Sequence, residues 1–182
     1  METFAAAREF VDDPRYKRHR ALVLAALDLD DIDVPLRGLI IGFARLPYCY
    51  TIQSCYGHFV HAAQRAPRNL QVLPDYDPGP IEYRMAYLAL CLENSKAGRN
   101  LRLLLERICA ADTESIQFGS SEWLWKRHRN SYAVQVEPDR FRDRDVAILG
   151  HQEALHVQQV RDRFFASLAA LVREMKDGLD TT

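Results

Sequence analysis

The densest group of reactive side chains in this 182-residue sequence lies between Tyr48 and His61. Two of the four cysteines and two of the six histidines fall in this stretch. Thiols act as nucleophiles, and imidazoles exchange protons near neutral pH. Cys55 precedes His58 by three residues, and Gly57 between them can take a positive φ, so the chain can turn sharply there. We therefore take Cys55 and His58 as the candidate catalytic residues.

The same stretch contains the residue types that bind zinc. Cys49, Cys55, His58 and His61 could supply thiolate and imidazole ligands. On a regular strand Cys49 and Cys55 share parity and could face the same side, whereas His58 and His61 have opposite parity. The spacing matches no common zinc finger. We expect buried or ordinary surface residues here, and no metal.

A second candidate cluster, from Ser120 to Asn130, combines aromatic rings with cations. It contains Trp123, Trp125, Lys126, Arg127, His128 and Arg129. Such a set can stack on a base and hold a phosphate. The alternative is that one tryptophan packs in the core and the basic residues are solvated. The sequence contains neither a glycine-rich phosphate loop nor a Gly-x-Ser-x-Gly elbow.

The composition is that of an ordinary globular protein, with 48% hydrophobic and 27% charged residues. The formal net charge of −1 argues against a protein that coats nucleic acid non-specifically, because such binding depends on phosphate neutralisation. The first ten residues lack the apolar region of a signal peptide, and no apolar run is long enough to cross a bilayer. We expect a cytoplasmic protein with reduced thiols and no membrane contact.

Hydrophobic periodicity predicts the elements that position these residues. Helices are expected over residues 14–29, from an N-cap at Asp33 to Pro47, from a cap at Asn94 or Ser95 to about Ala111, and over 152–175. Strands are expected over 85–92, 115–118 and 131–137, besides the segment that turns at Gly57, while Phe141–Gly150 reads as irregular. This order predicts one α+β domain over residues 1–182, with a mainly antiparallel sheet covered by helices and a long C-terminal helix.

The run from Thr51 to Phe59, Thr-Ile-Gln-Ser-Cys-Tyr-Gly-His-Phe, aligns without gaps with a strand–turn motif of the form Thr-x-Ser-Ser-Cys-Ser-Gly-Arg-aliphatic. On this motif the chain resembles the wybutosine-synthesis methyltransferase family, tRNA-modifying enzymes that methylate a tricyclic guanine derivative. The similarity extends over about residues 10–140 and does not include the final helix. Tyr56 stands at a serine of the motif and His58 at its arginine. Arginine is permanently charged, whereas histidine is charged only when protonated.

The resemblance implies S-adenosylmethionine as methyl donor and a modified guanine in tRNA as acceptor. Our first hypothesis is a protein of this type that binds a small molecule or nucleotide in a cleft between the two clusters. One wall would comprise Thr51, Gln53, Ser54, Cys55, Gly57 and His58, and the other Trp123, Arg127, His128, Asn130 and Ser131. Two alternatives stay open, and with them the question of catalysis. One is a non-catalytic binding module whose long C-terminal helix pairs in a homodimer, and the other is a thiol enzyme that uses Cys55.

Overall fold

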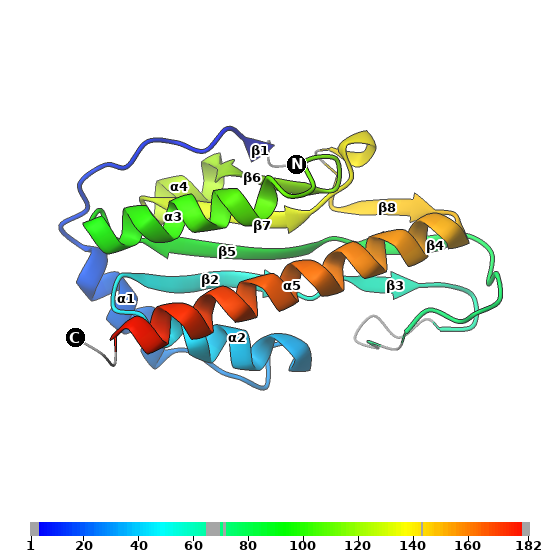
Figure 1. The fold of residues 1–182 in the computed structure, drawn as a ribbon, viewed down its shortest axis with the longest axis horizontal. Helices are drawn as coiled ribbons and strands as arrows, with labels where there is room; N and C mark the ends of the chain where they lie inside the picture. The colour runs from blue at the N-terminus through cyan, green and yellow to red at the C-terminus, as the bar shows by residue number, and fades with distance from the viewer. Residues whose placement is uncertain (1–3, 65–69, 71, 143, 180–182) are drawn as a thin grey trace.

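The computed structural model describes residues 4–64, 70, 72–142 and 144–179, and it confirms the predicted α+β fold with antiparallel sheets and a long C-terminal helix (Figure 1). The strands are β1 (Phe4–Ala5), β2 (Cys49–Cys55), β3 (His58–Val60), β4 (Ile81–Arg84), β5 (Ala86–Leu92), β6 (Ile116–Ser121), β7 (Ser131–Val136) and β8 (Val146–Leu149). The helices are α1 (Tyr16–Ala25), α2 (Val34–Arg45), α3 (Lys96–Cys109), α4 (Glu122–Arg127), the 3-10 turn η1 (Asp139–Phe141) and α5 (His151–Leu179).

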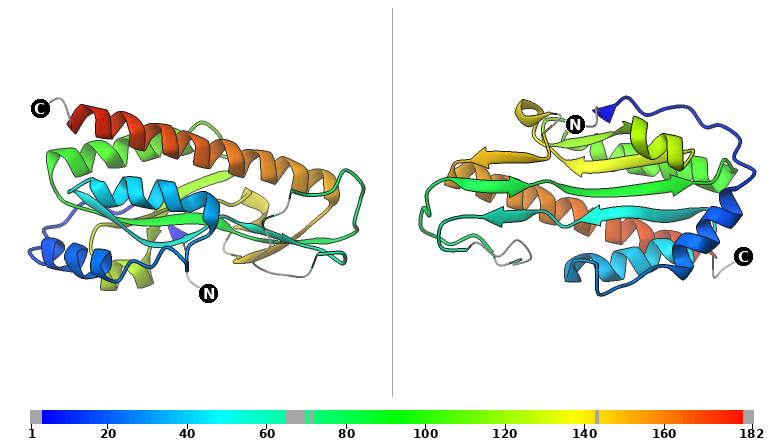
Figure 2. Two further views of the ribbon diagram at one scale, coloured as in Figure 1. Left: turned by 90° about the horizontal axis from the view of Figure 1, so that it is seen from below. Right: turned by 180° about the vertical axis from the view of Figure 1, so that it is seen from behind.

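The strands form two sheets that follow one another along the long axis of the molecule. The five-stranded sheet has the order β1-β6-β7-β5-β2, and the three-stranded sheet has the order β3-β4-β8. Helices α2, α3 and α5 cover one face, and α1 and α4 lie on the opposite side (Figure 2). We call this opposite side the open face.

The main hydrophobic core lies under the long helix. Apolar residues of α5 such as Val157, Phe164 and Leu168 are buried there together with Leu88 and Leu90 of β5. The apolar stripe predicted for this helix is therefore buried within the same chain, against the sheet and against α2 and α3. No described helix is both long and apolar enough to span a membrane.

A bulge in β2 reverses the alternation of its side chains. The pairing register with β5 shifts between Thr51 and Gln53. Before the shift, Cys49 packs into the core under the helices; after it, Cys55 lies on the open face. The interpretation that Cys49 and Cys55 face the same side is wrong, because one extra residue in a strand exchanges its two faces.

Gly57 sits where the chain passes from the five-stranded to the three-stranded sheet. Its φ is +87°, and a Cβ added to it would lie 2.7 Å from the Cβ of Ala86. The sharp turn predicted at Gly57 is wrong, because the chain does not reverse there: the pairing passes from Cys55↔Tyr87 to His58↔Arg84 without a change of register, and β3 continues in the direction of β2 (Figure 1). Tyr56 and Gly57 form only a short break between the two strands, which we call the turn, and Phe59 and Val60 follow in β3, as expected. Glycine is needed here both for its left-handed backbone and for the close approach of the neighbouring strand.

Two further predictions about local structure are wrong. The first helix is α1, which is shorter than the predicted 14–29. The segment 141–150 is not wholly irregular, because β8 lies within it and pairs with β4. Ala147 and Leu149 are buried there, while Val146 and Ile148 are exposed. The alternation of buried and exposed residues in β8 is only four residues long and lies next to charged residues, so the sequence did not predict a strand there. Its partner β4 was not predicted as a strand either.

Candidate functional site

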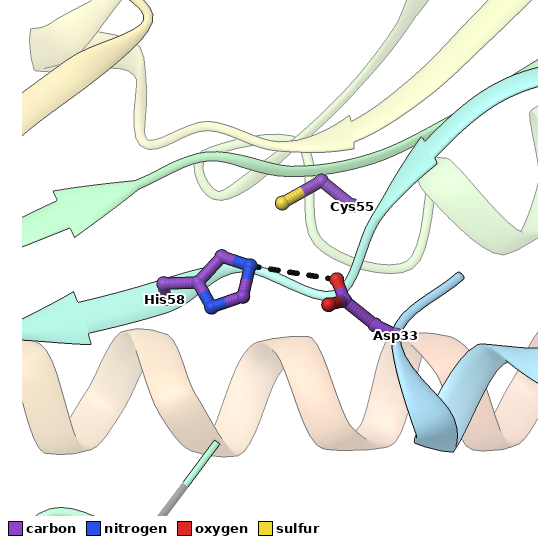
Figure 3. A group of neighbouring side chains, drawn as sticks. All are labelled: Asp33, Cys55 and His58. Carbon is purple, nitrogen blue, oxygen red and sulfur yellow. Dashed lines mark ion pairs between the residues drawn. The ribbon is translucent and has the colours of Figure 1, made fainter. Parts of the chain in front are cut away.

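Three side chains that could carry chemistry meet where β2 gives way to β3. They are Asp33, Cys55 and His58, which we call the turn cluster (Figure 3). One donor atom of each lies within 4.8 Å of the others, and Asp33 Oδ2 is 3.4 Å from His58 Nε2. The His58 and Asp33 side chains are only 11% and 19% exposed. The cluster is therefore a largely shielded set of one acid, one thiol and one imidazole.

Asp33 does not cap α2 in the way that we predicted. It occupies the N-cap position, but its side chain makes no capping hydrogen bond. Instead the backbone N–H of Tyr56 donates to Asp33 Oδ2 at 2.8 Å. The Gly57 N–H donates in turn to Cys55 Sγ at 3.4 Å. The backbone amides of Tyr56 and Gly57 thus hold Asp33 and Cys55, two members of the cluster. The Asp33 side chain contacts the turn and does not cap its own helix.

The electrostatics of the cluster favour a positive charge on His58. Hydrogen bonding to Asp33 and then to Cys55 raises the pKa of His58 to about 9, although burial opposes the charged form. His58 is accordingly protonated at neutral pH when no other cation is present. Its Nδ1 is buried and has no hydrogen-bond partner among the described residues.

The cluster is not arranged as a nucleophile–imidazole–carboxylate relay. In such a relay the nucleophile and the carboxylate contact opposite ring nitrogens. Here Cys55 and Asp33 approach the same edge of the His58 ring, the edge that carries Nε2 (Figure 3). The three donors therefore converge on one point in space, and no chain of proton transfers runs through the ring.

Helix α5 holds the turn from the covered side through Arg161. This residue is buried, and its Nη1 donates to the Gly57 carbonyl at 3.1 Å. Its guanidinium carbon lies 4.3 Å from the centre of the Tyr56 ring. The guanidinium group also forms an ion pair with Asp162. Asp162 also accepts from the Tyr56 hydroxyl at 2.9 Å. Sequence reasoning missed Arg161 because it lies more than a hundred residues from the turn and belongs to no local motif.

A cavity of about 550 Å³ opens on the open face and reaches the cluster at Cys55. We call it the open-face cavity. Its lining includes Gln53, Cys55, Tyr87, Gln135, Ser121 and Leu124. Arg84 and Arg144 contribute cations to the same lining, and Glu82, Glu137 and Asp145 contribute carboxylates. A second hollow of about 410 Å³ between α2 and α5 has no cysteine, histidine or carboxylate among its lining residues, so we look for function in the first.

The residues predicted for the first wall divide between the two faces of the sheet. Gln53 and Cys55 line the open-face cavity. Thr51 and Ser54 instead pair with Leu90 and Leu88, whose side chains belong to the core on the covered face. The division follows from the bulge at Ile52, which sequence parity did not reveal.

The residues predicted for the second wall do not line the open-face cavity. Trp123 is 44% exposed and carries the guanidinium of Arg127 at 3.7 Å from its ring centre. His128 Nδ1 lies 3.2 Å from the Tyr50 hydroxyl. Burial, then His19 and Arg127, lower the pKa of His128. The segment reaches the cavity through Ser121 and Leu124, at the start of α4.

Asn130 and Ser131 occupy closed positions at the beginning of β7. The Asn130 side chain accepts from the Val11 N–H at 2.9 Å and donates to the Val11 carbonyl at 2.8 Å. Ser131 is 1% exposed. Trp125 packs against the main core, in line with the alternative that one tryptophan is structural. The structure therefore ties this part of the segment to the N-terminal stretch around Val11 and does not bring it to the turn cluster.

No family model, curated protein or solved structure matches this chain. The resemblance to the wybutosine-synthesis methyltransferase family therefore stays a prediction from the sequence, and so does the function that it implies.

Proposed function

We propose that this chain binds a nucleotide or modified base in the open-face cavity, with S-adenosylmethionine as the methyl donor that the motif implies. The observation that supports the proposal is the make-up of the cavity wall at the motif itself. Gln53 and Cys55 of the motif meet Tyr87 and Gln135 of the neighbouring strands in one hollow. The volume of about 550 Å³ lies within the range typical of small-molecule sites.

The wall offers the groups that a purine derivative needs. The ring of Tyr87 provides a face for stacking, and burial raises the pKa of its hydroxyl, which therefore stays neutral and can donate a hydrogen bond. The amide of Gln53 can donate to and accept from a base edge, and the amide of Gln135, whose Nε2 already donates to Glu137 Oε2 at 2.6 Å, can accept from one. Arg144 can meet a phosphate or carboxylate, whereas Arg84 already pairs with Glu82 at 2.8 Å.

The replacement of the motif's arginine by His58 is compatible with this proposal. Asp33 raises the pKa of His58 to about 9, so that a positive charge persists at neutral pH where the motif has arginine. In the methyl transfer the sulfonium–carbon bond breaks, a bond to the acceptor forms, and the acceptor loses a proton to solvent. His58 does not line the cavity, so its charge would act on an anionic ligand from behind Cys55, and it would not serve as the base.

The test is calorimetric titration with S-adenosylmethionine and with guanosine nucleotides, using two neighbouring variants of β2. Gln53→Ala removes a hydrogen-bonding group from the cavity, so affinity should fall about tenfold, as expected for the loss of about 1.4 kcal/mol. Ser54→Ala changes the covered face and should leave affinity unchanged. Equal effects of the two variants, or no binding of either ligand by the unmodified chain, would contradict the proposal. If the chain binds these ligands but transfers no methyl group to guanosine-containing acceptors, the result would support the alternative of a non-catalytic binding module.

A thiol enzyme is the second candidate, favoured by the exposure of Cys55. Among the four cysteines, all unpaired, Cys49, Cys91 and Cys109 are buried, while Cys55 is partly exposed and lines the cavity. If Cys55 is a nucleophile, iodoacetamide should modify it faster than a free cysteine in a peptide, and His58→Gln should slow that reaction. Ordinary reactivity in both proteins would remove this candidate.

A further inference from the structure

We infer that Asp33, Cys55 and His58 form a binding site for a transition-metal ion of the zinc class. This inference goes beyond the proposed ligand cavity and stands whether or not the cavity binds a nucleotide. It also revises the expectation of no metal, because the sequence had brought Cys49 and His61 into consideration and left out Asp33. The structure buries Cys49 on the other face, where its thiol donates to the Phe43 carbonyl.

The spacing of one pair of donor atoms matches a tetrahedral site, and the third donor atom lies close to both. With metal–nitrogen and metal–oxygen bonds of about 2.1 Å, two ligand atoms of a tetrahedral zinc ion lie about 3.4 Å apart. Asp33 Oδ2 and His58 Nε2 are 3.4 Å apart, and a donor of each of the three residues falls within 4.8 Å of the others. All three point into one space (Figure 3). One ion could therefore contact all three after small side-chain movements.

The charges suit a divalent ion in a shielded place. A thiolate, a carboxylate and a neutral imidazole carry two negative charges in total, which a divalent cation neutralises. That balance matters because the Asp33 and His58 side chains are less than one-fifth exposed. Arg161, the cation that packs on the turn, is paired with Asp162 at 2.8 Å and so places little uncompensated charge beside the site.

Backbone groups already hold two of the ligands in place. The Tyr56 N–H binds Asp33 Oδ2 at 2.8 Å, and the Gly57 N–H binds Cys55 Sγ at 3.4 Å. Outer-sphere hydrogen bonds of this kind orient metal ligands and strengthen binding. Gly57 can supply its amide here because it adopts φ +87°. The short break between β2 and β3 thereby acquires a role beyond the change of sheet.

The ligand set selects the class of metal. A thiolate with an imidazole disfavours Mg²⁺ and Ca²⁺, which prefer oxygen ligands, and suits Zn²⁺ or Co²⁺. Three protein ligands leave one tetrahedral position for water or another molecule, as in catalytic zinc sites. Because Cys55 also lines the open-face cavity, a molecule in the fourth coordination position would lie close to a ligand bound in that cavity.

The experiment is a titration of the chelator-treated full chain with Zn²⁺ in competition with a chromophoric chelator, repeated with Co²⁺. We expect one ion per chain, and with Co²⁺ both a thiolate-to-cobalt charge-transfer band and the visible bands of tetrahedral cobalt. Cys55→Ser, His58→Gln and Asp33→Asn should each weaken binding by more than the roughly 10- to 100-fold that outer-sphere partners contribute. His61→Gln and Cys109→Ala are matched controls that should bind as the unmodified chain does, with circular dichroism confirming the fold of every variant.

A second measurement uses the unmodified chain and so does not depend on any variant folding. One equivalent of Zn²⁺ should protect Cys55 from alkylation, as read by mass spectrometry of the modified peptides. Absence of saturable binding, binding that survives both Cys55→Ser and His58→Gln, or unprotected Cys55 at saturating Zn²⁺ would each overturn the inference. Failure of nucleotide binding would count against the proposed function alone.

Discussion

The turn cluster and the segment Trp123–Ser131 were expected to face each other, and each contains one histidine in a partly buried position. Their surroundings differ in charge. Asp33 lies beside His58 and raises its pKa to about 9, whereas burial, His19 and Arg127 lower the pKa of His128. The first region is thus built to hold a positive charge, either a proton or a metal ion, and the second excludes one. Residue type alone could not separate them.

The two regions also contain one left-handed residue each, and for different reasons. Gly57 has φ +87° at a place where Ala86 leaves no room for a side chain. Asn130 has φ 59° and uses its side chain to bind both backbone groups of Val11. The first region is thus a shielded cluster that meets the cavity only at Cys55, and the second is a closed structural joint.

The largest expected effect is that of Gly57→Ala. It should lower the free energy of unfolding by about 4 kcal/mol, because overpacking against Ala86 costs about 1–3 kcal/mol and a left-handed alanine a further 1–3 kcal/mol. Urea denaturation measures the change. Gly38→Ala is the control: it lies in α2 with no neighbour within 4 Å of the added carbon, and it should be neutral or stabilising by up to about 1 kcal/mol. Similar results for both variants would contradict the role given to the turn.

The second-largest effect is expected for Asn130→Ala, which should lower the free energy of unfolding by about 3 kcal/mol. About 2 kcal/mol comes from the two hydrogen bonds with Val11 and about 1 kcal/mol from the left-handed backbone. Asn130→Gly keeps the backbone conformation accessible and should lose less than Asn130→Ala. If neither variant were destabilised while ligand affinity fell, the segment would be a binding wall after all, and the contrast between the regions would fail.

The pH dependence of stability should have opposite signs at the two histidines in metal-free protein. The raised pKa of His58 means that its stabilising contribution is complete below about pH 6.5, the unfolded value, and is lost as pH rises towards about 9. The lowered pKa of His128 means that the unfolded chain takes up the proton first, so this group destabilises the fold as pH falls below about 6.5. NMR titration of both imidazole rings measures which of the two pKa values is higher, and His58→Gln and His128→Gln assign the signals. His128 titrating above His58 would contradict both environments.

The smallest effect on stability is expected for Arg127→Ala. The guanidinium over the exposed Trp123 ring contributes about 0.5 kcal/mol. If tRNA is the partner that the motif implies, the same change should weaken tRNA binding and reduce its salt slope by about 1. Arg163→Ala, an exposed cation on α5, is the matched control that should alter neither quantity. Equal losses of tRNA affinity in the two variants would show that this surface is not specific.

Much of the fold followed from local patterns. The apolar repeat from Val157 to Met175 predicted α5, and the alternation after Ser131 predicted β7, since periodicity reports which side of an element is buried. Ser95 caps α3, as one of the two predicted residues. The β8 strand escaped detection because only four residues alternate and its pairing with β4 supplies the rest of the stabilisation.

Less of the candidate site could be predicted. The motif located Cys55, Gly57 and His58, because a glycine between a thiol and an imidazole is a local signal. The bulge at Ile52 decided which motif side chains reach the cavity, and a single-residue shift in pairing leaves no trace in composition. Nothing in the sequence connected Arg161 with the Gly57 carbonyl.

By itself, then, the amino-acid sequence determined the α+β class, the long C-terminal helix with its apolar stripe, and the place of Gly57 between two strands, because backbone preferences and hydrophobic periodicity act over a few residues. Only the tertiary structure decided that Asp33 joins Cys55 and His58, and that Asn130 and Ser131 belong to a closed joint. Those relations depend on strand register and on contacts between segments distant in the chain, which local preferences do not encode.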